Sequence, residues 1–184
     1  MDMNWPDLYL RHFVRYLGKP FDIQVYRQED GDNLRIATFD QRYPNYKLYA
    51  SLGLSNHGAN LGGIGEVILF SDEKKGKDVP LLFVHSLFFI MQKKIALDSR
   101  FAIGGIEMIN PDFAEYFQKV AIYYTLADGF DPGFEKVKDG LVYQGIFISW
   151  AEQDYLNRNG PVAFDEKFHA QDSDPCSLRR PSCV

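Results

Sequence analysis

The sequence predicts an α+β fold: a mixed, mostly antiparallel sheet packed by helices in a single layered domain. Three observations lead to this prediction. Strand-like segments follow one another as hairpins, helical segments lie between these groups instead of alternating with single strands, and no linker or internal repeat divides the chain. The 184 residues are 46% hydrophobic and 24% charged, which is enough apolar material for one core. Aromatic residues make up 15% of the chain, so most of them must lie in that core or in a binding surface.

The first part of the chain predicts one helix and four strands. Asn4 caps the helix, whose apolar residues recur at helical spacing until Gly18 ends it. The first two strands form a hairpin about an acidic, glycine-containing turn, and residues 55–65 form a polar, glycine-rich loop before the fourth strand. The expected strands cover residues 21–27, 34–39, 46–54 and 66–70.

The second part predicts a central helix followed by further strands and helices. Apolar residues occur on nearly every helical face of residues 79–97, which is typical of a helix buried against a sheet. A pair of glycines interrupts the strand predicted over 101–109 and favours a bulge there. Ser149 and Glu152 have the spacing of a capping box. The remaining expected elements are a short helix from Asn110, strands over 120–126 and 141–148, and helices over 149–158 and 161–169 around a stop at Gly160.

The domain is expected to span residues 1–170, and residues 171–184 are expected to form a disordered C-terminal tail. The tail is rich in Asp, Ser, Pro, Cys and Arg and has no periodicity. Both cysteines, Cys176 and Cys183, lie in this tail, so the body of the domain has no disulfide. This distribution is typical of a reduced cytosolic protein.

The charge and hydropathy patterns exclude several classes of partner. The net charge of −5 and the isoelectric point of about 5.3 argue against a general nucleic-acid binder, which needs a basic face. The N-terminus lacks the apolar stretch of a signal peptide, and the most apolar run, residues 79–91, is too short to cross a bilayer, which needs about 20 residues. A cytoplasmic protein without a nucleic-acid or membrane partner is therefore expected. A mildly acidic surface would suit a basic protein partner, and it would equally suit solubility.

No motif for catalysis, metal binding or cofactor binding stands out. The four histidines are widely separated, and no two have the spacing of metal ligands on a helix. The glycines of residues 58–63 lack the lysine that a phosphate-binding loop needs, and Ser55 and Ser86 lack the flanks of a nucleophile elbow. The acidic clusters lie in turns, where solvent keeps the pKa values of carboxyl groups from moving apart. We therefore expect no cofactor, no metal and no enzymatic activity.

Two functional alternatives remain open from the residues themselves. His57, in the glycine-rich loop, is the one histidine well placed for a function, so a small hydrolase that uses His57 and a distant carboxylate is one alternative. Binding through a surface is the other. Asp98, Arg100 and Glu107 flank the bulged edge that is expected at the glycine pair, and a partner can dock on such an exposed sheet edge, so these three residues are the expected contact surface.

Several segments resemble the suppressor of fused family. The sequence Tyr-Ala-Ser-Leu-Gly-Leu-Ser at residues 49–55 resembles the aromatic-x-x-x-Gly-Leu-Ser signature of this family, and the apolar strand after it resembles the next strand of the family. The order and spacing of the segments add to the match, which covers roughly residues 5–168. The segments that carry the resemblance are 49–55, 65–70, 87–97, 101–104 and 146–160.

The resemblance implies a protein-binding module. Animal members of the family have two domains and bind a transcription factor of the Hedgehog pathway, whereas this chain has the length of the first domain only. Compact single-domain members are bacterial, and many resemble immunity proteins of polymorphic toxin systems, which bind a toxin in the cytoplasm and neutralise it. An immunity protein, or antitoxin, that covers a basic toxin domain is therefore the leading expectation. A regulatory scaffold that binds an endogenous protein or peptide is the alternative.

Overall fold

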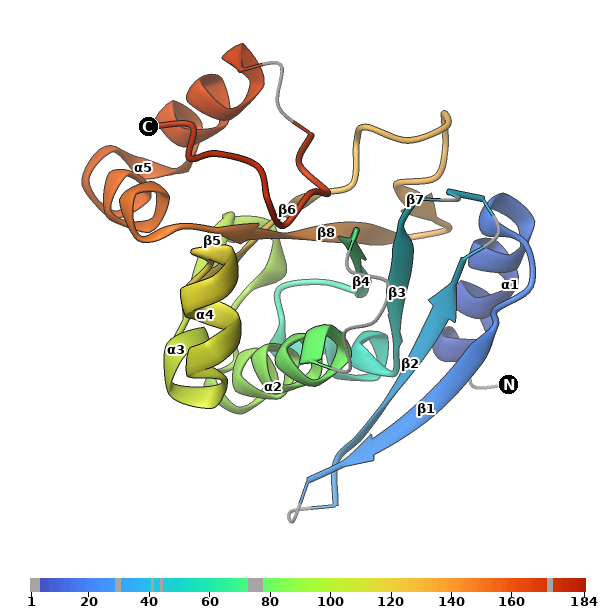
Figure 1. The fold of residues 1–184 in the computed structure, drawn as a ribbon. Coiled ribbons are helices and arrows are strands. Elements are labelled where there is room, and N and C mark those ends of the chain that lie inside the picture. Colours follow the sequence, from blue (N-terminus) through green and yellow to red (C-terminus); the bar gives the residue numbers. More distant parts are fainter. Residues whose placement is uncertain (1–3, 29–30, 41, 44, 73–77, 172–173) are drawn as a thin grey trace.

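A computed structural model describes residues 4–28, 31–40, 42–43, 45–72, 78–171 and 174–184. Its centre is one sheet with the strand order β1-β2-β3-β4-β8-β6-β5, and the short β7 pairs beside it with β8 (Figure 1). The strands are β1 (Asp22–Arg27), β2 (Asn33–Phe39), β3 (Lys47–Leu52), β4 (Gly65–Ser71), β5 (Phe101–Gly104), β6 (Ala121–Leu126), β7 (Lys136–Val137) and β8 (Gly140–Ile148).

The sheet is mixed and mostly antiparallel, which confirms the predicted fold class. The two central strands, β4 and β8, run parallel, and the other pairs are antiparallel. A parallel pair cannot be joined by a tight turn. The chain accordingly leaves β4, forms the helices and the β5–β6 end of the sheet, and then returns as β8.

Helices cover both faces of this sheet. Alternate residues of β4 show the two layers, because Val67 and Leu69 pack in the core that α2 covers, and Ile68 and Phe70 pack in the core that α1 covers. In Figure 1, α2, α3 and α4 lie on one side of the sheet, whereas α1 and α5 lie at opposite ends of the molecule. The helices are α1 (Trp5–Leu17), α2 (Asp78–Lys93), α3 (Ile106–Ile109), α4 (Pro111–Phe117) and α5 (Trp150–Ala170), with 3₁₀ helices η1 (Leu54–Asn60) and η2 (Leu97–Ser99). Within the described part of the chain, no helix is both long and apolar enough to span a bilayer.

The segment predicted as a strand over 101–109 differs from that prediction. Strand β5 ends at Gly104, and Gly105 has a left-handed backbone with φ of +96°, after which the chain turns into α3. Glycine adopts this conformation without a steric penalty, so it ends the strand where a bulge was expected. The polar loop predicted over 55–65 likewise contains a helical part, η1.

Helix α5 follows the sequence pattern closely. The hydroxyl of Ser149 accepts from the amide of Glu152, and the carboxylate of Glu152 accepts from the amide of Ser149, so the predicted capping box is present. At Gly160 the backbone leaves helical geometry, with φ of +81°, and a second helical part begins at Pro161. The predicted stop is therefore a kink between two helical parts.

The C-terminal segment, residues 174–184, differs from the disordered tail that the sequence predicts. It contains no helix or strand, yet Leu178 and Cys183 are only 1% and 3% exposed. Leu178 packs in the core beneath α2, and Cys183 packs in the core beneath α5. Asp72 accepts hydrogen bonds from the Ser177 hydroxyl (2.6 Å) and the Leu178 amide (3.0 Å). Isolated anchors of this kind leave no periodic pattern in the sequence, which explains why the prediction missed them.

Candidate functional site

The free end of the sheet at β5 lies beside a small apolar cavity. Among the described residues, β5 pairs only with β6, so its other side is an edge. A cavity of about 230 Å³ lies between this strand, α2 and α3. Met108 is 82% exposed at its rim, and Phe89 and Ile109 are about two-fifths exposed. The side chains around it are mostly apolar and include Leu82, His85, Phe89, Ile103, Met108 and Ile109.

An edge strand beside an apolar cavity has the two features that strand addition requires. The outward N–H and C=O groups of an edge strand can pair with an extended segment of another protein. Alternate side chains of that segment then point to one face of the sheet and can enter a cavity there. Ile103 of β5 faces the α2 core and lines the cavity, which places the cavity on the face that an added strand would share.

The three predicted contact residues lie near this edge but do not form one cluster. Asp98 lies in η2 and Arg100 follows it, both before β5, whereas Glu107 lies in α3 after the strand. The four residues of β5 separate the two ends by roughly 13 Å at a rise of about 3.3 Å per residue. The guanidinium of Arg100 pairs with Asp165 of α5 at 2.9 Å, which holds it toward the opposite face of the sheet.

Glu107 has a distinctive environment. Its Oε2 atom is buried and has no hydrogen-bond partner among the described residues. Buried polar atoms in folded proteins are nearly always hydrogen-bonded, because an unsatisfied one costs about 1–3 kcal/mol.

His57 lies in η1 and is half-buried. Among the residues that the structure describes, no carboxylate hydrogen-bonds to its ring, and no group of three or more His, Cys, Asp or Glu side chains has the arrangement of a metal site. Within the described part of the chain, the hydrolase alternative is therefore not supported by a carboxylate paired with His57.

The sequence analysis missed the role of Glu66. This carboxylate is fully buried and accepts five hydrogen bonds from the segment that carries the Gly-Leu-Ser motif. The hydroxyls of Ser51 and Ser55 each donate at 2.6 Å, and the amides of Gly53, Leu54 and Ser55 donate at 2.7, 3.2 and 3.1 Å. Burial raises the pKa of Glu66, and these hydrogen bonds oppose the rise. The motif therefore binds a structural carboxylate, and the serines two residues either side of Gly53 were its sequence signal.

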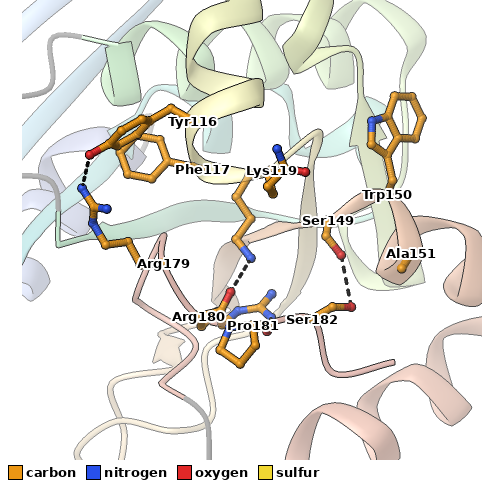
Figure 2. A pocket seen from close by; sticks show the side chains of 11 residues that line it. Tyr116, Phe117, Lys119, Ser149, Trp150, Ala151, Arg179, Arg180, Pro181 and Ser182 are labelled. Carbon is orange, nitrogen blue, oxygen red and sulfur yellow. Dashed lines mark hydrogen bonds between the residues drawn. The ribbon is translucent and has the colours of Figure 1, made fainter.

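A second candidate surface, the C-terminal groove, lies where α4, the start of α5 and the C-terminal segment meet. It has a volume of about 610 Å³, and Figure 2 shows its 11 lining residues. Tyr116 and Trp150 are exposed on two sides of it, and Lys119 extends between them toward the C-terminal segment. The guanidinium of Arg179 lies 4.9 Å from the centroid of the Tyr116 ring. The groove is therefore lined by aromatic rings and cationic groups.

A buried ion pair holds the C-terminal segment against this groove. Arg180 donates to both carboxylate oxygens of Glu152 and, at 2.8 Å, to the carbonyl of Phe147. The side chains of both residues of the pair are at most 2% exposed. Burial alone would raise the pKa of Glu152, but the hydrogen bonds and charge of Arg180 outweigh it, so the pKa of Glu152 is lowered. Glu152 was predicted only as a helix cap, and the sequence carried no signal for its second partner.

Lys119 is the second buried cation of the groove, with 1% of its surface exposed. Its ammonium donates to the carbonyl of Arg180 at 3.1 Å. Burial, together with the charge of Arg180, lowers the pKa of Lys119 to about 8. Among the described residues, no carboxylate lies within ion-pair distance of this ammonium.

Comparison with known proteins supports the fold. No protein-family model matches the sequence, and no curated protein matches it. Among solved structures, the chain is similar to one described as a "Putative SUFU (suppressor of fused protein) homolog" from Neisseria gonorrhoeae, with a TM-score of 0.76 and 14% sequence identity. The match covers 100% of this chain and 98% of that protein. The chain therefore has a SUFU-like fold over its whole length.

Proposed function

We propose that this protein is a protein-binding domain that takes up an extended segment of a partner along the edge of β5 and performs no catalysis. The observation that carries the proposal is the open edge of β5 beside an apolar cavity. An added strand would pair with the backbone and place a side chain in the cavity, and Glu107 would contact the partner just after the strand. Asp98 and Arg100 would contact the partner at the other end of the strand.

Within this class, we propose an immunity protein that acts in the cytoplasm by covering a toxin. The similarity to a SUFU homolog supports binding as the general role, and the net charge of −5 supports a basic partner. Opposite charges on two proteins accelerate their association and select against wrong partners. A regulatory scaffold for an endogenous protein would use the same edge, so the identity of the partner distinguishes the two functions.

A capture experiment tests the β5 edge. The tagged full-length chain is expected to recover one protein from the native host, identified by mass spectrometry. Met108→Lys places a charge at the rim of the cavity and should lower recovery about tenfold, because the partner's apolar side chain would meet an ammonium. Val162→Lys is the matched control, since Val162 is 64% exposed on α5. Equal recovery with both variants would refute the proposed edge.

A growth experiment tests the immunity function. The captured partner is expressed in a bacterial host with and without this protein. Immunity predicts that the partner alone stops growth, that the wild-type chain restores it, and that Met108→Lys restores it poorly. A harmless partner that is encoded by the host itself would contradict immunity and support the scaffold.

A further inference from the structure

The C-terminal groove contains more positive than negative charge in its interior. Lys119 and Arg180 are both buried, and Glu152 is the one buried carboxylate beside them among the described residues, which leaves one net positive charge. A charge removed from water costs several kcal/mol unless it is paired, and a hydrogen bond to a neutral carbonyl offsets only part of that cost. The Lys119 ammonium has three N–H donors, and the described contacts use one of them.

Neighbouring donors would also favour a negative group in the groove. The first turn of α5 opens into it, and its capping box satisfies the amide of Glu152. The amides of Trp150 and Ala151 are in the same turn, where no intrahelical acceptor is available. The positive end of the helix dipole adds to the attraction. The Nε atom of Arg180 is also buried, and it has no hydrogen-bond partner among the residues that the structure describes.

We propose that the C-terminal groove binds a carboxylate on an acidic peptide segment of a protein partner. A carboxylate monoanion would balance the one net positive charge of the three buried groups, Lys119, Arg180 and Glu152. The exposed rings of Tyr116 and Trp150 flank the groove, and aromatic side chains of this kind anchor peptide segments at protein interfaces. The volume of about 610 Å³ is in the range of sites that hold several side chains. This site is separate from the β5 edge, so one can be correct without the other.

The test uses the full-length chain and a pair of capped pentapeptides, Gly-Glu-Phe-Gly-Gly and Gly-Gln-Phe-Gly-Gly. Amide shifts in nuclear magnetic resonance spectra report binding. The glutamate peptide should shift the amide signals of Trp150 and Ala151 saturably, and the glutamine peptide should bind at least about tenfold more weakly. Lys119→Met should lower the affinity for the glutamate peptide by a similar factor, because it removes the cation and keeps most of the apolar stem. Arg158→Met, a cation change on the exposed side of α5, should leave the affinity unchanged.

Several results would overturn the proposal. Equal binding of the two peptides, unchanged affinity in Lys119→Met, or no saturable shift with either peptide would each do so. Inorganic phosphate that shifts the same amides while the glutamate peptide does not would replace the carboxylate by a phosphate ligand. If Lys119→Met does not fold, Trp150→Ala takes its place, since Trp150 is 60% exposed and its loss should weaken peptide binding several-fold without unfolding the chain. Met108→Lys at the β5 edge should not change the affinity for either peptide.

Discussion

Two buried glutamates hold two distant regions of this domain, and they do so by different means. Glu66 is surrounded by neutral donors that all come from a short stretch of chain before it, and no cation takes part in its described hydrogen bonds. Glu152 instead pairs with the guanidinium of Arg180, 28 residues further along the chain. It also accepts a hydrogen bond from the amide of Cys183 at 3.1 Å. The first arrangement shapes a turn between two strands, and the second fixes the end of the chain.

The difference shows how a buried charge can be tolerated. A carboxylate that collects several hydrogen bonds from the backbone keeps its geometry without a counter-ion, but burial still disfavours its charge. A carboxylate paired with arginine retains its charge strongly, and each member of the pair then depends on the other. Single substitutions around Glu66 should therefore each lower the stability in proportion to the hydrogen bonds that they remove. The region around Glu152 should instead lose its order when either Glu152 or Arg180 is replaced.

The largest expected effect is that of Arg180→Met. It leaves the buried Glu152 without its cation, and removing one member of a buried pair costs about 3–5 kcal/mol. Denaturant unfolding measures this loss of stability. The double variant Glu152→Gln, Arg180→Met should be less destabilised than the single one, because it buries no unpaired charge. A double variant that is as unstable as Arg180→Met would show that lost packing, and not charge, accounts for the effect.

Glu66→Gln should have an intermediate effect. The amide nitrogen of glutamine would face hydroxyl and N–H donors that now point at a carboxylate oxygen, so at least one buried donor would lose its acceptor. We expect a loss of about 1–3 kcal/mol in the free energy of unfolding. Ser55→Ala removes a single hydroxyl donor and should cost about 0.5–1.5 kcal/mol. A larger loss for Ser55→Ala than for Glu66→Gln would contradict the role given to the carboxylate.

The two glutamates should respond to pH with opposite signs. Since the pKa of Glu152 is lowered in the folded state, its contribution is complete above the unfolded pKa of roughly 4.3 and is lost as the pH falls through the folded value. The stability advantage of wild type over Glu152→Gln should therefore shrink on acidification. The pKa of Glu66 is raised, so the folded state takes up its proton first, and the advantage of wild type over Glu66→Gln should grow as the pH falls. Unfolding curves between neutral and acidic pH measure both stability differences. If both differences grew, or both shrank, on acidification, the contrast drawn here between Glu66 and Glu152 would be wrong.

The smallest expected effect is that of Arg158→Ala, which breaks an exposed pair with Asp154 on α5. The two side chains are 74% and 54% exposed, and the pair spans one helical turn. Exposed pairs at this spacing contribute about 0.3–0.5 kcal/mol. Thermal unfolding should thus hardly change. A loss comparable to that of Arg180→Met would mean that ion pairs on α5 matter regardless of burial.

The sequence predicted the parts of the fold that local patterns encode. The strands around the Gly-Leu-Ser motif, the capping box of Ser149 and Glu152 and the stop at Gly160 all rest on residues within a few positions of one another. Each has a short-range physical cause: alternation, a cap or a glycine. The position of Gly105 was noticed, but its left-handed backbone turned the chain into a helix instead of bulging a strand.

The candidate sites could be predicted only in part, because they depend on contacts between distant segments. Arg100 and Glu107 were chosen for their place beside a strand, yet the pairing of Arg100 with Asp165 could not be read from the sequence. The C-terminal groove needs α4, α5 and the C-terminal segment together, and no periodicity marks that last segment. Arg180 and Leu178 look like ordinary tail residues until their buried partners are known.

Amide hydrogen exchange tests most directly whether the C-terminal segment belongs to the folded domain. The amides of Leu178 and Cys183 donate to Asp72 and Glu152, so in the wild type they should exchange as slowly as the amides of α5. In Arg180→Met their protection should fall, while the amides of Gly53 and Ser55 that donate to Glu66 stay protected. Fast exchange of Leu178 and Cys183 in the wild type, at the rate of an unfolded chain, would contradict both the docked segment and the groove that it forms.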